Sequence, residues 1–155
     1  MLGKLLALSL LFLAPILQGD RMEQKQAKAR DMQFSWSIQG DVLQGTMRAK
    51  TRGWLAVGFN KNSGLKGARL IMASLHKNKA RVEEHVVDPP RHWFKEGSTV
   101  RLISAEEKGY HTQVKFSLPL EHFREGEEIE LILAFSDYDD FDHHSAMREH
   151  QTIKL

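Results

Sequence analysis

Apolar and polar residues alternate along most of the chain after Met32, with the two-residue period of β-strands that bury one face. The pattern is clearest in residues 34–38 and 110–118, and a further apolar row of this period runs from Ile129 to Phe135. Other short strands are predicted at residues 41–50, 54–59, 68–76, 80–87, 98–104 and 150–155. About eight or nine short strands with polar turns and no long amphipathic helix are typical of an all-β, antiparallel, immunoglobulin-like β-sandwich.

Three local features refine this pattern. The segment "EEKG", residues 106–109, is expected to form a hairpin turn that ends in glycine. The segment "PLEHFR", residues 119–124, indicates a single helical turn. In the final strand, Ile153 falls on the apolar phase and is expected to be buried.

The N-terminus has the pattern of a cleavable secretory signal peptide. One lysine precedes an apolar run from Leu5 to Leu17, which is shorter than the roughly 20 residues that a membrane-spanning helix needs. Residues 1–19 are therefore expected to be removed, with a cut near Gly19 or, alternatively, after the small residues 27–29. Residues 20–31 have few bulky apolar side chains and are expected to be a flexible leader to a domain that spans residues 32–155.

Composition narrows the class of protein. Without cysteine the chain has neither disulfides nor a thiolate metal site. The net charge is only +2, whereas nucleic-acid-binding proteins usually carry a large excess of basic residues. After the N-terminal apolar run, no other segment is long and apolar enough to span a membrane stably. The expected product is one domain of about 135 residues in the periplasm or the extracellular space.

The most unusual stretch is "SDYDDFDHHSAMREH", residues 136–150, which holds four aspartates and three of the eight histidines. Two ligands would suit this composition, a divalent cation or a haem with one axial histidine. The cation interpretation points to His143 and His144 as metal ligands, with the aspartates supplying oxygen. A solvated polar turn between two strands is the third interpretation.

Several motifs in order resemble a DOMON domain, the β-sandwich module of dopamine β-monooxygenase and of the cytochrome domain of cellobiose dehydrogenase. The family pattern contains a Trp-hydrophobe-Gly-Phe strand, a Gly-Ala strand, a Phe-x-x-Pro-Leu signature and a closing histidine followed by arginine. The matching residues are Trp54, Gly58, Phe59, Gly67, Ala68, Phe116, Pro119, Leu120, His144 and Arg148. Together they cover most of the chain after the leader.

The resemblance implies a ligand-binding module, with haem b and electron transfer to a redox partner protein as the first expectation. It assigns His144 as an axial ligand. For Arg148 two partners stay open, a haem propionate or the aspartates just upstream in a surface ion pair. Leu65 stands where several haem-binding members have methionine, so Met72 is the remaining sulfur candidate, although methionine also commonly fills core space.

The alternative expectation is a haem-free module that binds a sugar or another protein. Trp93 and Phe94 lie in a predicted loop, where they either cap the core or stay exposed for stacking. The sequence contains no Gly-x-Ser-x-Gly elbow, and Glu84 and Glu130 fall on what reads as the polar phase of their strands. We therefore expect a binding module and not an enzyme.

Overall fold

The computed structural model describes residues 22–155, so the expected signal peptide at residues 1–19 lies outside the described residues. Eleven strands and no helix are present in residues 22–155. The strands are β1 (Lys25–Ala29), β2 (Met32–Gln39), β3 (Val42–Ala49), β4 (Leu55–Asn60), β5 (Arg69–His76), β6 (Lys79–Asp88), β7 (Arg91–Phe94), β8 (Arg101–Lys108), β9 (His111–Pro119), β10 (Glu128–Phe135) and β11 (Met147–Lys154).

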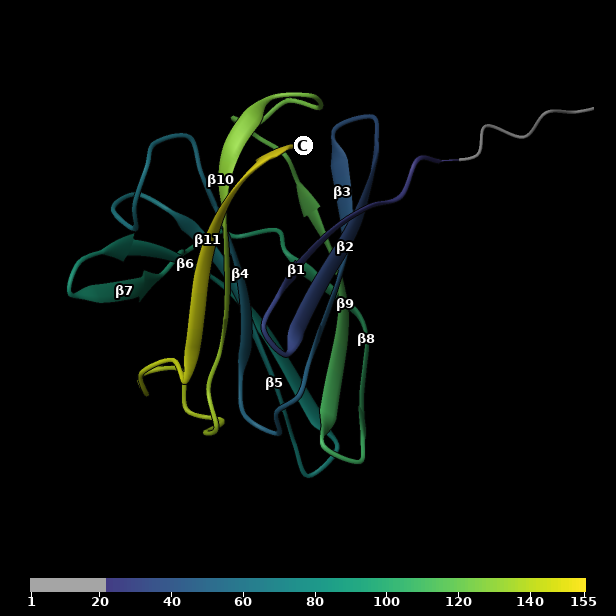
Figure 1. Cartoon of the computed structure of the whole chain (residues 1–155), viewed down its shortest axis with the longest axis vertical. Coiled ribbons are helices and arrows are strands. Elements are labelled where there is room, and N and C mark those ends of the chain that lie inside the picture. The colour runs from purple at the N-terminus through teal and green to yellow at the C-terminus, as the bar shows by residue number, and fades with distance from the viewer. Residues whose placement is uncertain (1–21) are drawn as a thin grey trace, which may run out of the picture.

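The strands form two antiparallel sheets, which confirms the predicted sandwich. One sheet has the order β1-β2-β3-β9-β8, and the other has the order β11-β10-β4-β5-β6-β7. In Figure 1 the five-stranded sheet lies on the right and the six-stranded sheet on the left, where the β6–β7 hairpin forms the outer edge. No helix in residues 22–155 is long and apolar enough to cross a membrane.

The core lies between the two sheets and is centred on Phe34. This fully buried ring stacks on Trp36 at a centroid distance of 5.2 Å, and it meets Phe59 of the opposite sheet edge-on at 6.0 Å. Gly45 of β3 leaves space for these rings, since a Cβ atom there would lie 2.7 Å from Phe34 and from Phe116. The inward phases predicted from alternation in β2, β9 and β10 are thus confirmed.

The expectation of a flexible leader is wrong for residues 25–29. They form β1, which pairs with β2 in the register Lys25↔Trp36 to Ala29↔Met32. Ala27 is buried in the core, and the Nζ atom of Lys25 donates a hydrogen bond to the Leu155 carbonyl oxygen at 2.7 Å. Low hydrophobicity misled the prediction because an edge strand is held largely by backbone hydrogen bonds, which composition does not report.

Three other local predictions differ from the structure. The hairpin turn falls on Gly109 and Tyr110, because the ladder continues to the pair Lys108↔His111. The segment near Leu120 forms turns and not a helical turn. Ile153 lies against the core but is only partly buried, since β11 is an edge strand with one neighbour.

Candidate functional site

The outer face of the six-stranded sheet carries Met72 and Arg148, two of the residues assigned to a ligand site. The ladders place them in one row across the sheet, Arg148↔Ala134, Ala134↔Ala56 and Ala56↔Met72. Three strand spacings of about 4.8 Å put their backbones about 14 Å apart. The sheet surface between Met72 and Arg148 carries only the small side chains of Ala134 and Ala56, so another group can pack on it.

That group is the ring of Phe141, which comes from the loop between β10 and β11. Trp54, Ala56, Met72, Ala134 and Phe141 form one buried apolar cluster on this outer face. Met72 is only 1 % exposed within it. Arg81 covers the far side of the Phe141 ring, with its guanidinium carbon 4.0 Å from the ring centroid. Met72 therefore fills core space beneath the loop, which is the role commonly taken by an unbranched thioether.

Backbone and hydroxyl hydrogen bonds fasten the base of this loop to the chain before β4. Thr51 Oγ1 donates to the Ser136 carbonyl oxygen at 2.5 Å, and Trp54 N–H donates to the Tyr138 carbonyl oxygen at 2.9 Å. Gly53 lies between these contacts. A Cβ atom on Gly53 would approach the backbone nitrogen of Tyr138 to 2.5 Å and the carbonyl carbon of Asp137 to 2.6 Å.

Replacing Gly53 by alanine is therefore expected to displace the loop. Backbone atoms cannot rotate away as a side chain does, so the free energy of unfolding should fall by about 1–3 kcal/mol. Amide hydrogen exchange should also become faster in residues 136–146. Arg52→Ala is the control because this neighbouring side chain is exposed. Equal exchange rates in the two variants would contradict this account of the loop.

His143 and His144 both lie in this loop with exposed rings. The His143 ring stacks on Tyr138 at a centroid distance of 4.3 Å, and its Nδ1 atom lies 3.5 Å from a carboxylate oxygen of Asp140. The backbone carbonyl of His144 accepts a hydrogen bond from Ser136 Oγ at 3.0 Å. Three of the four aspartates are exposed, and Asp139 pairs with His76 at 2.7 Å. This arrangement supports the solvated-turn interpretation for the aspartates.

Metal ligation by His143 and His144 stays a prediction. Residues 22–155 contain no group of three or more histidine, aspartate or glutamate side chains placed to hold one metal ion. Each of the two rings sits in a turn whose hydrogen bonds are local, such as Asp142 N–H to Asp140 Oδ1 at 3.0 Å.

The described residues do not fit a haem held by Met72 and His144. Phe141 is 2 % exposed and occupies the position above Met72 where the porphyrin would have to lie. Leu65, at the position of the family methionine, packs with Ala68 and Ile132 and has no donor atom. One observation speaks for a ligand: the buried Nε1 atom of Trp54, in the same cluster, has no hydrogen-bond partner among residues 22–155.

A network of charged side chains lies inside the sandwich, where the sequence indicated none. Glu84 is 0 % exposed and faces the inner side beside Ile71, so its assignment to a polar phase is wrong. Its Oε1 atom accepts a hydrogen bond from Arg69 Nε at 2.6 Å, and its Oε2 atom accepts one from Ser98 Oγ at 2.6 Å. The signal that could have found it is its phase, which it shares with Val82 and Val86.

The charge state of Glu84 follows from this network. Burial alone would raise the pKa of its carboxyl, but the hydrogen bonds from Arg69 and Ser98, with the positive charges of Arg69 and Lys95, hold that pKa below its ordinary value. An ionised, fully paired carboxylate has no proton to give as a general acid. We therefore assign Glu84 a structural role as the buried partner of Arg69.

His85 is a second buried polar residue that the sequence pattern did not single out. It is 7 % exposed on the outer face of β6, and its ring meets those of His92, Phe94 and Phe141 edge-on. Burial lowers the pKa of His85, and the hydrogen bond to Glu83 acts in the opposite direction without outweighing it. The sequence signal was again the phase of the strand: His85 directly follows Glu84 and therefore lies on the opposite face of β6.

The lowered pKa of His85 predicts a pH dependence. The unfolded chain binds a proton at this residue below about pH 6.5, whereas the folded chain resists it, so the unfolding free energy should decrease as the pH falls through that value. Urea unfolding of the parent and of His85→Gln, measured between about pH 5 and 8, checks this prediction. The parent should lose more stability on acidification than the variant; parallel curves would refute it.

The β6–β7 hairpin, residues 84–95, exposes apolar side chains on both of its faces, and we call it the β6–β7 wing. Trp93 is 57 % exposed and lies across from Val86, while Phe94 is also 57 % exposed and lies across from His85 on the other face. The core-capping interpretation of Trp93 is therefore wrong. Trp93 belongs to β7, the edge strand of its sheet, and the β6–β7 hairpin projects from the rest of the sandwich (Figure 1).

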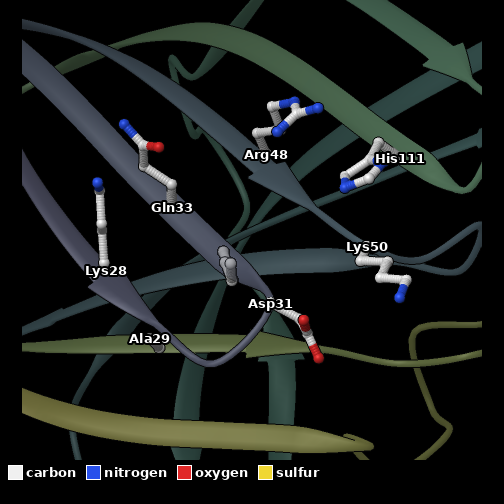
Figure 2. A pocket seen from close by; sticks show the side chains of 8 residues that line it. Lys28, Ala29, Asp31, Gln33, Arg48, Lys50 and His111 are labelled. Atoms are coloured by element: carbon white, nitrogen blue, oxygen red, sulfur yellow. The ribbon is translucent and has the colours of Figure 1, made fainter.

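Hollows in the surface lie elsewhere. One of about 240 Å³ opens beside β1, β2 and β3, and its border includes Lys28, Arg48, Lys50 and His111 as well as the acidic Asp31. Figure 2 shows Lys28 and Lys50 at opposite sides of it, with amines that point away from each other. Another, of about 290 Å³, lies by Ser35 and Lys115. Neither is bordered by the residues assigned to haem or metal, and the basic groups do not converge on one anion.

Comparison with known proteins places the chain. Two solved structures share its fold. The cytochrome b domain of pyranose dehydrogenase from Coprinopsis cinerea has a TM-score of 0.66 and 10 % identity, and the match covers 80 % of this chain and 76 % of that one. The cytochrome domain of cellobiose dehydrogenase from Myriococcum thermophilum has a TM-score of 0.63 and 10 % identity, and the match covers 86 % of this chain and 82 % of that one. No curated protein matches the chain in sequence. The family model of the DOMON domain matches residues 28–133. The chain therefore belongs to the DOMON domain family.

Proposed function

We propose that the chain is an exported, haem-free interaction module that binds an extended segment of a partner protein along β7. The observation that carries this proposal is the exposure of Trp93 and Phe94 on opposite faces of one edge strand. An extended peptide sends alternate side chains to the two faces of the sheet that it joins, so it would contact both rings. A sugar ring, in contrast, stacks on one aromatic face.

The position of β7 supports the same mode of binding. It is the last strand of its sheet, so among residues 22–155 its second backbone edge has no neighbouring strand. The apolar side chains of Trp93 and Phe94 flank this edge, and Val86 of β6 lies across from Trp93. Exposed tryptophan and phenylalanine are enriched at protein interfaces, and an unprotected strand edge offers backbone donors and acceptors to a partner. The predicted signal peptide supports action outside the cytoplasm.

Haem binding with electron transfer is the competing function, and the orphaned Trp54 Nε1 atom is the observation that favours it. It requires Phe141 to leave its place above Met72. The purified chain should be mixed with hemin and freed of unbound hemin before its absorbance is recorded. A colourless parent agrees with the proposal; an intense haem band in the parent that Met72→Leu or His144→Ala abolishes would replace it by the haem function.

The interaction itself is tested with a peptide selected against the purified chain from a phage-displayed library of random dodecapeptides. Its Kd should rise by about 30-fold, or about 2 kcal/mol, in Trp93→Ala, which is the usual effect of removing an aromatic anchor. Tyr110→Ala is the matched control, because Tyr110 is the exposed aromatic residue of a hairpin in the other sheet. On binding, the β7 amides should gain protection from hydrogen exchange.

The possible outcomes distinguish a protein ligand from a sugar ligand. A peptide affected equally by Trp93→Ala and Tyr110→Ala contradicts docking at the wing. If no peptide is selected and a glycan array binds the parent but not Trp93→Ala, the wing recognises a sugar and the protein-binding proposal is overturned.

A further inference from the structure

Two histidine rings meet at the base of the β6–β7 wing with nitrogen atoms facing each other. His85 Nδ1 and His92 Nδ1 are 2.9 Å apart, and the ring centroids are 4.9 Å apart at an angle of 66°. His85 is buried, whereas His92 is half-buried and reachable from solvent. The pair bridges β6 and β7, which are held together at this end by only a four-residue ladder.

Glu83 determines which nitrogen of His85 is free. Its Oε2 atom lies 2.9 Å from His85 Nε2 and accepts the proton of that nitrogen, so His85 Nδ1 carries a lone pair. His92 Nδ1 must then supply the hydrogen atom of the contact between the rings. Glu83 is itself fixed by Arg81, whose Nε atom donates to Oε1 at 2.7 Å.

We propose that His85 Nδ1 and His92 Nδ1 form a two-nitrogen binding site for a divalent transition metal, copper(II) or zinc(II), with Glu83 as the carboxylate that orients His85. A carboxylate that accepts the second N–H of a metal-binding imidazole is the usual support of such ligands. Imidazole nitrogens suit copper, zinc and nickel, and copper(II) binds tightest in this series.

The geometry requires little movement. Two nitrogens at 2.0–2.1 Å from a tetrahedral zinc ion lie about 3.3 Å apart, so the half-exposed His92 ring needs to retreat by about 0.4 Å. The metal takes the position of the hydrogen on His92 Nδ1, and that proton moves through solvent to His92 Nε2. No net proton is released while both rings are neutral.

The site has two protein ligands, in keeping with the absence of any group of three converging ligands in residues 22–155. The remaining coordination positions open toward solvent on the outer face of β7 and are filled by water. The metal would link β6 to β7 and so hold the wing in place. This inference does not depend on the proposed protein partner, because the metal is bound by the free chain.

The test is a titration of the untagged chain with copper(II), and then with zinc(II), followed by calorimetry and by the NMR signals of the histidine rings. One copper ion per chain is expected, and the signals of His85 and His92 should broaden before those of the other six histidines. His92→Ala should weaken binding at least tenfold, and Glu83→Gln should weaken it by about 10–100-fold.

His122→Ala is the matched control, because His122 is exposed and lies outside both the pair and the β10–β11 loop; it should bind copper as the parent does. Far-UV circular dichroism without metal verifies that each variant is folded. Broadening that begins at His143 and His144, or equal affinities for His92→Ala and His122→Ala, overturns the proposal. The order in which the histidine NMR signals of the parent broaden tests the proposal even if a variant fails to fold.

Discussion

Replacing Glu84 by alanine is expected to lower the free energy of unfolding by about 3–5 kcal/mol, because it removes the buried carboxylate nearest to the guanidinium of Arg69. Arg69 is 8 % exposed, and its other contacts are the Leu120 carbonyl oxygen at 3.2 Å and the more distant Glu121 at 3.6 Å. The measurement is urea unfolding near pH 7 for parent and variant.

Glu107→Ala is the control for the Glu84 prediction. Glu107 pairs with Arg52 at 3.6 Å on the surface, where an ion pair contributes about 0–1 kcal/mol. The double variant Arg69→Met/Glu84→Leu should be more stable than Glu84→Ala, since it removes both charges and retains the apolar volume. If Glu84→Ala costs no more than Glu107→Ala, the buried pair is not a major source of stability.

The same pair makes the fold sensitive to acid. The pKa of Glu84 is lower in the folded than in the unfolded chain, where it is about 4.3. Its contribution to stability is therefore complete above that value and is lost as the pH falls through the lower, folded pKa. The acid sensitivity of Glu84 and that of His85 occupy different pH ranges, so measurements on the two variants separate them.

Replacing Phe34 by alanine should have an effect of similar size, about 3–5 kcal/mol, because it removes the ring on which both sheets converge. Phe34 is fully buried and contacts the rings of Trp36, Phe59 and Phe116. Thermal and urea unfolding of the variant provide the measurement.

Phe94→Ala is the matched control for Phe34→Ala, since it deletes the same ring from an exposed position on the wing. Its cost should stay within about 0.5 kcal/mol, the usual range for surface substitutions. A large loss of stability in Phe94→Ala would mean that the wing is part of the folding core, which would weaken its assignment as a binding surface. Equal losses in both variants would contradict the placement of the core.

Membership of the DOMON family establishes the fold of this chain, whereas the ligand depends on its local structure. The family match ends at residue 133, before the loop that carries His143 and His144 and before Arg148. The segment that the resemblance assigned to haem thus lies outside the matched region, and Phe141 from that segment packs over Met72. The shared fold supplies a scaffold, while the side chains on its outer face decide which ligand is bound.

Strand positions and the phases of β2, β9 and β10 were determined by the sequence itself, because one buried face imposes a two-residue period that is visible within a few residues. The family was also recognisable from the order of short motifs. Prediction failed where local composition and tertiary environment disagree: the polar segment of β1 is a strand because β2 offers it a free edge.

Only the tertiary structure decided which polar residues pair with each other inside the sandwich and which histidines meet. Glu84 is buried because the ladder Ile71↔Glu84 places it beside Arg69. His85 and His92 face each other because the turn at Pro89 and Pro90 folds β7 back on β6. Phe141 reaches Met72 across the sheet from a loop far along the chain. These contacts depend on sheet register and on the path of a loop, which are set by packing between distant segments and leave no periodic signal in the sequence.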